Sequence, residues 1–329
     1  MESGRPAAKG AAAKRPAVKT IVIDCDPGID DALALALAHG SPGLEIAGVT
    51  TVSGNVSLAR TTANALALRE YLGFPEVPVV PGSARPLLRP PINAAGVHGD
   101  HGLGGVRLPE PALPPAPGHA VDFLIDTLAS RPGEVTLVAI GPLTNVALAV
   151  RKEPRITEWA RELVILGGSY TRGNVTPAAE FNMAADPEAA AVVFGAGWTV
   201  TMIGLDVSRS ALATGPVLDR MRALGRLGTE LLAPCAEFYG MVTATEGPAI
   251  HDTCAVAYLV DPSLIEVQPA VVEVETAGRL TSGMTVVDFE LAGRAPNALV
   301  GTSLDVARFW DLTLSAYARV RPTARSLSG

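Results

Sequence analysis

The sequence is poor in several kinds of residue, and each shortage excludes a class of protein. Only 5% of the 329 residues are aromatic and 18% are charged, whereas 48% are hydrophobic. Such a chain has far more apolar side chain than a disordered protein, so it can offset the entropy lost on folding. The longest apolar stretches, residues 32–38 and 135–140, are much shorter than the roughly 18 residues of a membrane span. We therefore expect a globular protein that does not enter a membrane.

Positive charge and cysteine are also scarce. The net charge is −7, and because the first 19 residues carry +4, the remaining 310 carry −11. An acidic body lacks the basic stripe that a nucleic-acid-binding surface needs. The three cysteines, Cys25, Cys235 and Cys254, form neither a CxxC pair nor an even disulfide framework. This usage is typical of reduced thiols, so we expect a cytoplasmic protein without a nucleic-acid partner.

The chain divides into one domain and two short tails. Residues 1–19 are rich in Ala, Pro, Lys and Arg and show no apolar periodicity, which predicts a disordered basic tail. Residues 20–320 contain no repeat and no linker that would split them, and residues 321–329 are expected to form a C-terminal tail.

Strand-like and helix-like segments alternate through most of this domain. The pattern predicts strands at residues 19–24, 44–53, 77–80, 135–140, 163–166 and 198–203. It predicts helices at residues 30–39, 57–71, 120–130 and 187–194, another after residue 142, and a mostly helical insertion around residues 206–260. Such alternation with nearly continuous apolar strands indicates an α/β fold, in which helices cover both faces of a mostly parallel, Rossmann-like sheet.

Four carboxylates follow the first predicted strand within eight residues. They lie in the run DCDPGIDD, residues 24–31, at the strand end where ligands of such sheets bind. Helix capping accounts for Asp30 and Asp31 but not for Asp24 and Asp26. Carboxylates this close repel one another, and their oxygens select a hard cation such as Ca²⁺ or Mg²⁺. The cluster therefore predicts a divalent metal site.

Three known kinds of site can be compared with this run. An EF-hand loop starting at Asp24 would need Glu where Leu35 stands, so it fails. A dehalogenase-type phosphohydrolase, with Asp24 as nucleophile, matches the Asp-x-Asp pattern but not the Pro27-Gly28 that follows. The run DCDPGIDDALALALA, residues 24–38, resembles the amino-terminal signature of the nucleoside hydrolases, the inosine–uridine preferring N-ribohydrolase family.

Later segments resemble other motifs of the same family, in the same order. They lie at predicted strand ends or in loops, and they are TTVSGN at 50–55, VHGDHGLG at 97–104, GPLTNVA at 141–147, AEFNM at 179–183 and IHDTCAVA at 250–257. Beyond residue 270 the correspondence is weak.

The resemblance implies a Ca²⁺ ion held by Asp26, Asp31, the backbone carbonyl of Ile140, and Asp252. A water and two ribose hydroxyls would complete the six to eight oxygen ligands that Ca²⁺ takes. Judged by itself, Asp252 would equally suit the N-cap of a helix over residues 253–260.

The implied reaction is hydrolysis of the N-glycosidic bond of a ribonucleoside, through an oxocarbenium-like centre attacked by metal-activated water. Asp26 would be the general base and His251 the acid that protonates the departing base. Asp24 would orient neighbouring groups in the site. The residues implied to bind substrate are Asp30, Asn55, His98, Leu166, Asn174, Glu180, Phe181 and Asn182.

Two alternatives stay open beside this interpretation: the phosphohydrolase, and a Ca²⁺-stabilised nucleoside-binding protein without catalysis. Asp26 and His251 favour the enzyme, because binding alone needs neither a base nor an acid. The family resemblance also implies a homo-oligomer, a dimer or tetramer. The preferred base is left open, since Phe238, Tyr239 and Glu246 lie in the segment expected to cover it.

Overall fold

A computed structural model describes residues 18–245 and 247–323 of the chain. The predicted basic tail, apart from residues 18 and 19, and Glu246 therefore lie outside the described residues, as do residues 324–329 of the predicted C-terminal tail. Residues 321–323 run along α2 (Leu58–Leu72), where the Thr323 backbone N–H donates to the carbonyl of Tyr71.

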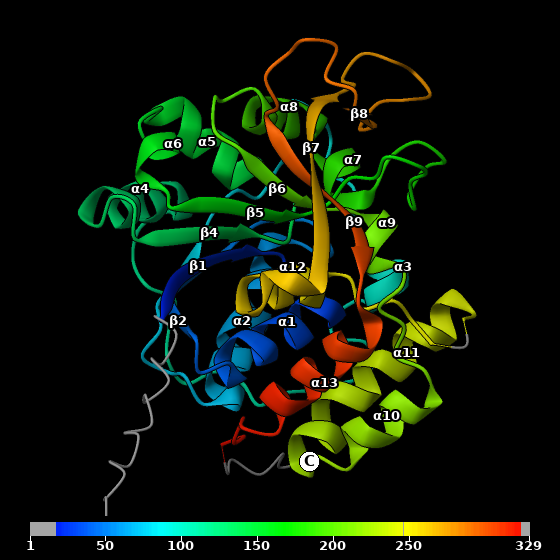
Figure 1. Ribbon diagram of the computed structural model, residues 1–329. Helices are drawn as coiled ribbons and strands as arrows, with labels where there is room; N and C mark the ends of the chain where they lie inside the picture. Colours follow the sequence, from blue (N-terminus) through cyan, green and yellow to red (C-terminus); the bar gives the residue numbers. More distant parts are fainter. Residues whose placement is uncertain (1–17, 246, 324–329) are drawn as a thin grey trace, which may run out of the picture.

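One nine-stranded sheet forms the centre of the molecule, in the order β3-β2-β1-β4-β5-β6-β9-β7-β8 (Figure 1). Its strands are β1 (Lys19–Cys25), β2 (Leu44–Thr51), β3 (Val79–Pro81), β4 (Val135–Ala139), β5 (Glu162–Leu166), β6 (Val200–Ile203), β7 (Ile265–Val274), β8 (Thr285–Asp288) and β9 (Ala298–Leu304). The six strands predicted from the sequence are β1 to β6, and they pair in parallel. This arrangement confirms the predicted α/β class with a mostly parallel sheet.

The strand order reverses between β1 and β4, where connections leave the sheet in opposite directions. Such a reversal opens a crevice at the carboxyl ends of the two strands, and this crevice is the usual ligand site of doubly wound sheets. The DCDPGIDD run leaves β1 at this point, and Ile140 directly follows β4. The topology alone therefore brings these two segments together.

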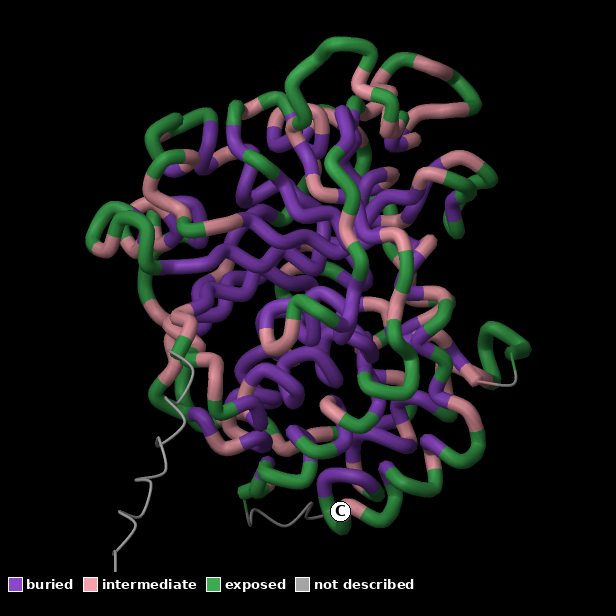
Figure 2. The backbone as a smooth tube through the Cα atoms, viewed as in Figure 1, coloured by how far each residue is buried: buried purple, intermediate pink, exposed green. Residues whose placement is uncertain are grey.

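Helices cover both faces of the sheet, as predicted. One face carries α1 (Ile29–Gly40), α2, α12 (Asp252–Val260) and α13 (Val306–Tyr317), while the other carries α4 (Ala120–Ser130), α5 (Thr144–Lys152), α6 (Ile156–Trp159) and α8 (Pro187–Phe194). Figure 2 shows the buried residues concentrated in the sheet and in the helices next to it. Two apolar layers enclose the strands, and they explain how a chain so rich in Ala, Val and Leu stays folded in water.

The region after β6 is mostly helical, as the sequence predicts. It contains α9 (Leu205–Ser208), α10 (Gly215–Arg222), a π-helical turn η1 (Gly228–Leu232), α11 (Ala233–Thr243) and α12. Three short helices elsewhere, α3 (Ala95–His98), α7 (Phe181–Ala185) and the 3₁₀ turn η2 (Pro262–Leu264), connect longer elements. Within the described residues, no helix combines the length and apolar character that crossing a membrane requires.

The last part of the sheet is the one that the sequence did not predict. β7 pairs antiparallel with β9 through residues 265–270 and with β8 through residues 271–274. Pro269 interrupts β7, and proline normally argues against an interior strand because it has no N–H to donate. Here it lies in the half of β7 that pairs with β9 alone, so one edge of the strand has no partner strand at this position.

Candidate active site

A pocket of about 200 Å³ opens at the carboxyl ends of β1, β4 and β5. It is lined by residues from many separate segments of the chain: Asp30, Asn55, Ala94, Val97, His98, Ile140, Leu166, Asn174, Val175, Glu180, Phe181, Leu205, Tyr239, Thr243, His251 and Asp252. Its lining combines polar side chains, such as Asp30, Asn174 and Glu180, with apolar ones, such as Val97, Val175 and Leu205. A ligand with one polar and one apolar part would suit this lining.

Most residues predicted to bind substrate line this pocket. Seven of the eight do so: Asp30, Asn55, His98, Leu166, Asn174, Glu180 and Phe181. Asn182 is not among the lining residues, because its Nδ2 donates to the backbone carbonyls of Ile140 (3.0 Å) and Leu166 (3.1 Å). It therefore ties the ends of β4 and β5 together beside the pocket.

Three buried carboxylates converge at one edge of the pocket. One oxygen from each of Asp30, Asp31 and Asp252 lies within 4.8 Å of the others. Burial raises the pKa of all three, and the pKa of Asp31 rises to about 7 with the charge of Asp30 adding to it. Three buried anions this close are unstable unless a cation or protons neutralise them. The donor set therefore fits a hard divalent cation.

This cluster overlaps only partly with the predicted metal ligands. Asp31 and Asp252 belong to both sets, whereas Asp30, which was expected to bind ribose, supplies the third carboxylate. The carbonyl of Ile140, another predicted ligand, accepts the Asn182 hydrogen bond and lines the same pocket. A carbonyl oxygen has two lone pairs, so this bond leaves one for a further partner.

The side chain of Asp26, the fourth predicted ligand, is closely packed next to the cluster. Its Oδ2 accepts a 2.6 Å hydrogen bond from the backbone N–H of Asn55. A Cβ atom on Gly141 would lie 2.6 Å from its Oδ1, and one on Gly54 would overlap its Oδ2. The two glycines therefore leave the space that the Asp26 carboxylate fills. Burial, reinforced by the charge of Asp31, raises its pKa well above the ordinary value.

The loop after β1 is held together by Asp31. Its Oδ1 accepts from the backbone N–H of Asp26 (3.1 Å), and its Oδ2 accepts from Gly28 N–H (2.8 Å) and from Asn55 Nδ2 (3.1 Å). Charge-assisted bonds of this kind fix the loop geometry. Asn55 thus orients the carboxylates besides lining the pocket.

Asp24 lies behind the site within the sheet, where it was expected to orient other groups. Its Oδ1 accepts from Thr50 Oγ1 (2.5 Å) and from Asn145 Nδ2 (2.8 Å). Among the described residues, no hydrogen-bond partner reaches its Oδ2. Burial raises the pKa of Asp24 to about 6. Its place between Thr50 of β2 and Asn145 of α5 leaves it fully buried, with no exposed face for a nucleophile.

His251 stands directly before α12 and lines the pocket beside Asp252. Its Nδ1 lies 2.8 Å from the hydroxyl oxygen of Ser208. Burial lowers the pKa of His251, while the negative charge of Asp30 opposes this shift. The imidazole therefore sits within the same pocket as the carboxylates, and its Nε2 has no protein partner among the described residues.

His98 ends the short helix α3 and is buried in the pocket wall. The backbone N–H of Ile29 donates to its Nδ1 at 3.0 Å, and burial lowers the pKa of His98 to about 4. The ring is therefore neutral at pH 7 with its proton on Nε2. Tyr239 lies between the two histidines, with ring centroids 5.9 Å from His98 and 6.5 Å from His251.

The segment from β5 to α7 forms the remaining wall. Glu180 caps α7 by accepting from the backbone N–H groups of Asn182 and Met183, and it also accepts from Gly168 N–H (3.0 Å). Asn174 Oδ1 accepts from the backbone N–H of Phe181 (2.9 Å). These bonds place a carboxylate and an amide at the pocket surface.

Several lining residues carry no sequence signal of their own. Leu205 and Thr243 belong to α9 and α11, and their types are common in any helix. Ser208 of α9 does not line the pocket, but it contacts His251. Ser208 reaches the site only because α9 packs next to the start of α12. Of the residues expected near the base, Tyr239 lines the pocket, whereas the ring of Phe238 lies against Gly104.

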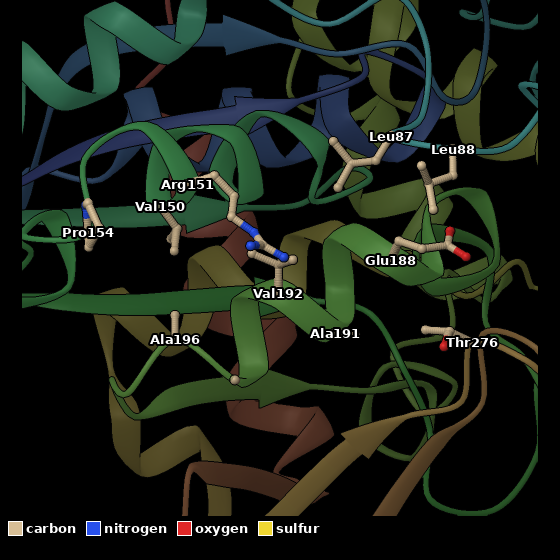
Figure 3. Close-up of a pocket in the computed structure, with 11 residues that line it drawn as sticks. Leu87, Leu88, Val150, Arg151, Pro154, Glu188, Ala191, Val192, Ala196 and Thr276 are labelled. Atoms are coloured by element: carbon tan, nitrogen blue, oxygen red, sulfur yellow. The ribbon is translucent and has the colours of Figure 1, made fainter.

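A larger hollow lies elsewhere on the surface, between α5, α8 and the loop of Leu87 and Leu88 (Figure 3). Its volume is about 890 Å³, and its charged lining residues are Arg151 and Glu188. None of the predicted site residues lines it. We therefore assign the chemistry to the smaller pocket, where the carboxylates and both histidines meet.

Comparisons with known proteins show which family the chain belongs to. The family model for inosine-uridine preferring nucleoside hydrolases matches residues 21–311. The chain is 44% identical over 309 residues to the inosine-uridine preferring nucleoside hydrolase of Leishmania major, covering 92% of this chain and 98% of that protein. It is 46% identical to the non-specific ribonucleoside hydrolase RihC of Escherichia coli, over 88% of this chain and 95% of that protein.

A solved structure with a similar fold is the purine-preferring ribonucleoside hydrolase from Gardnerella vaginalis, with a TM-score of 0.86 and 34% identity. The match covers 91% of this chain and 98% of that chain. The motifs, the parallel sheet and the relatives all lead to one assignment. This chain belongs to the inosine-uridine preferring nucleoside hydrolase family, whose members are enzymes that hydrolyse N-glycosyl bonds.

Proposed function

We propose that this protein hydrolyses the N-glycosidic bond of ribonucleosides to a free base and ribose, in a Ca²⁺-dependent reaction. One observation carries the proposal most strongly: a single pocket joins a buried carboxylate cluster to His251 and to side chains that can bind hydroxyl groups. The names of the relatives support the same substrate class.

The cation would be held by Asp26, Asp31, Asp252 and the carbonyl of Ile140. Asp31 and Asp252 already face one another with Asp30, and burial among these carboxylates raises the pKa of both, so their charged forms need a neutralising partner. When bound, the cation supplies positive charge that orients the attacking water and lowers its pKa.

Asp26 is the proposed general base. Its Oδ2 is already occupied by the Asn55 N–H, whereas no hydrogen-bond donor among the described residues reaches its Oδ1. Oδ1 is therefore the atom that would accept the proton of the attacking water. The neighbouring carboxylates favour positive charge on the ribosyl ring as the bond to the base breaks.

His251 is the proposed general acid for the departing base. Its Nδ1 is paired with Ser208, so Nε2 is the nitrogen that would donate a proton to the base. Burial lowers the pKa of His251, and the negative charge of Asp30 opposes this shift and so favours the protonated imidazole. The proposed base and acid come from different segments of the chain, the loop after β1 and the residue before α12.

The ribose would be bound by hydroxyl-binding groups around the strand ends. They are Asp30, Asn55, Asn174 and Glu180, with Leu166 beneath the sugar ring and His98 and Phe181 at its other edges. Asn182 would support this wall from behind, through its bonds to the carbonyls of Ile140 and Leu166. The nucleobase would lie among Val97, Val175, Leu205 and Tyr239. Interactions with the sugar raise turnover when they strengthen in the transition state.

We also propose a cytoplasmic location and a homo-oligomer, a dimer or tetramer. All three cysteines are free and buried, which is typical of proteins in a reducing compartment.

A substrate panel tests the proposed function. The enzyme is incubated with inosine, uridine and adenosine, and with an aryl phosphate, and the released base and phenol are measured. We expect base from at least one nucleoside and no phenol, and we expect Asp26→Asn to abolish base release while the exposed control Asp122→Asn leaves it unchanged. Phenol release without any base release would favour the phosphohydrolase, and tight nucleoside binding without turnover would favour a binding protein.

A further inference from the structure

The short helix α9 contacts the pocket, His251 and the segment that leads to Asn174. It follows β6, and its first residue, Leu205, lines the pocket. Its last residue, Ser208, is fully buried. A serine in an apolar layer needs a hydrogen-bond partner, and that partner identifies what the residue does.

That partner is the imidazole of His251. Ser208 Oγ lies 2.8 Å from His251 Nδ1. Within residues 18–245 and 247–323, this is the one side-chain hydrogen bond that either residue makes. Without it, the ring would be free to rotate about its χ angles in a pocket that has space on one side.

A hydroxyl is well suited to this place. It can accept from Nδ1 when that nitrogen carries a proton and donate to it when it does not. The contact therefore persists through a proton transfer at the other ring nitrogen. It also directs Nε2 away from α9, since the two ring nitrogens lie on opposite sides of the imidazole.

The helix that carries Ser208 is itself fixed. Asp206 accepts from Ser169 Oγ (3.1 Å) and from the backbone N–H of Tyr170 (2.8 Å). Arg209, directly after α9, donates from Nη2 to the carbonyl of Gly173 at 2.6 Å. These bonds hold α9 against the segment that ends in the pocket residue Asn174. The hydroxyl of Ser208 is therefore presented from a rigid support.

We propose that Ser208 is a positioning residue for the leaving-group step: its hydroxyl holds His251 so that Nε2 faces the departing base. The proposal rests on the proposed function, in which His251 protonates that base. It assigns the helix after β6 a part in catalysis, although none of its residues reacts.

Two substrates separate positioning from general structure. Inosine needs a proton on its leaving base, whereas 4-nitrophenyl riboside releases a stable phenolate without one. We expect Ser208→Ala to slow release of hypoxanthine from inosine by about tenfold or more, the scale of general-acid catalysis. Release of nitrophenolate should stay within about threefold of the unmodified enzyme, because that step needs no acid.

Two further variants sharpen the test. Ser208→Thr keeps the hydroxyl and should recover most of the inosine turnover that Ser208→Ala loses. Ser210→Ala is the matched control, since the Ser210 hydroxyl donates to the carbonyl of Val207 and not to His251. It should leave both substrates unaffected.

The outcomes are distinct. Unchanged inosine turnover in Ser208→Ala would overturn the positioning role, and so would equal losses on both substrates, which mark a general defect in the fold. If the unmodified enzyme releases no base from any ribonucleoside, the proposed function itself fails and this inference falls with it.

Discussion

At the scale of single residues, the site depends on space as much as on charge. The carboxylate of Asp26 fits between Gly54 and Gly141, and its two oxygens lie where side chains at those positions would be. Asn55 then fixes the carboxylate through its backbone N–H. Gly141, the first residue of the GPLTNVA motif, therefore leaves room for the Asp26 carboxylate because it has no side chain. The backbone carbonyl of Ile140 directly precedes it.

A glycine substitution tests whether Asp26 needs this space. In Gly141→Ala, the new Cβ would lie 2.6 Å from Asp26 Oδ1, so the carboxylate must move. A displacement of about 1 Å can cost about 100-fold in rate, and we expect a loss in kcat of that order with the fold intact. Gly96→Ala is the control, because a Cβ there meets no atom within 4 Å. A Gly141→Ala enzyme with normal kcat would show that the carboxylate has room to spare.

The site residues expected from the sequence lie at strand ends or in the loops between elements. The parallel sheet brings such ends together, so seven of the eight predicted substrate-binding residues line one pocket. Asn182 was placed in the right segment, but its amide bonds to two backbone carbonyls instead of lining the pocket. Ser208 was not predictable, because its role depends on how α9 packs beside α12.

At the scale of elements, Asp186 joins three segments on the face opposite α1. It caps α8 by accepting from Ala189 N–H (3.1 Å), and its other oxygen accepts from Leu87 N–H (2.8 Å) and Thr144 Oγ1 (2.7 Å). The residue is fully buried. One carboxylate therefore connects the starts of α5 and α8 with the loop after β3.

Two N-caps allow a matched comparison. Asp305 caps α13 through a 3.1 Å bond from Arg308 N–H, but it is exposed. We expect Asp305→Ala to lower the free energy of unfolding by about 1 kcal/mol, the usual value of a cap. Asp186→Ala should lower it by about 3 kcal/mol, because it also leaves buried donors without a partner. Urea unfolding measures both, and equal losses would mean that water replaces Asp186 without cost.

The strands predicted from the sequence are the parallel ones, β1 to β6, whereas β7, β8 and β9 were not predicted. Strands β1 to β6 are apolar and alternate with helices, so their period and turn residues identify them. β7 contains Pro269, and β7 and β8 lie at the sheet margin and form an antiparallel pair. Edge strands are only partly apolar and tolerate proline, which is why their local sequence did not distinguish them from loops.

At the scale of the whole molecule, the two-sided sheet accounts for the composition. Its apolar layers use the abundant Ala, Val and Leu, and the few charged residues lie mostly outside them. Among the described residues, the exceptions include Arg69, Glu180 and Asp186, and above all the aspartates gathered at the β1–β4 crevice. Stability gained from the large core can offset the cost of burying these charges, which a small domain would be less able to do.

The central claim is that these buried carboxylates hold the cation that nucleoside hydrolysis needs. The most direct test is the rate of hypoxanthine release from inosine after chelation, followed by addition of Ca²⁺. We predict a fall of about 100-fold or more on chelation, since the site then lacks the charge that activates water, and full recovery with Ca²⁺. A metal-free enzyme that keeps its rate would contradict the account.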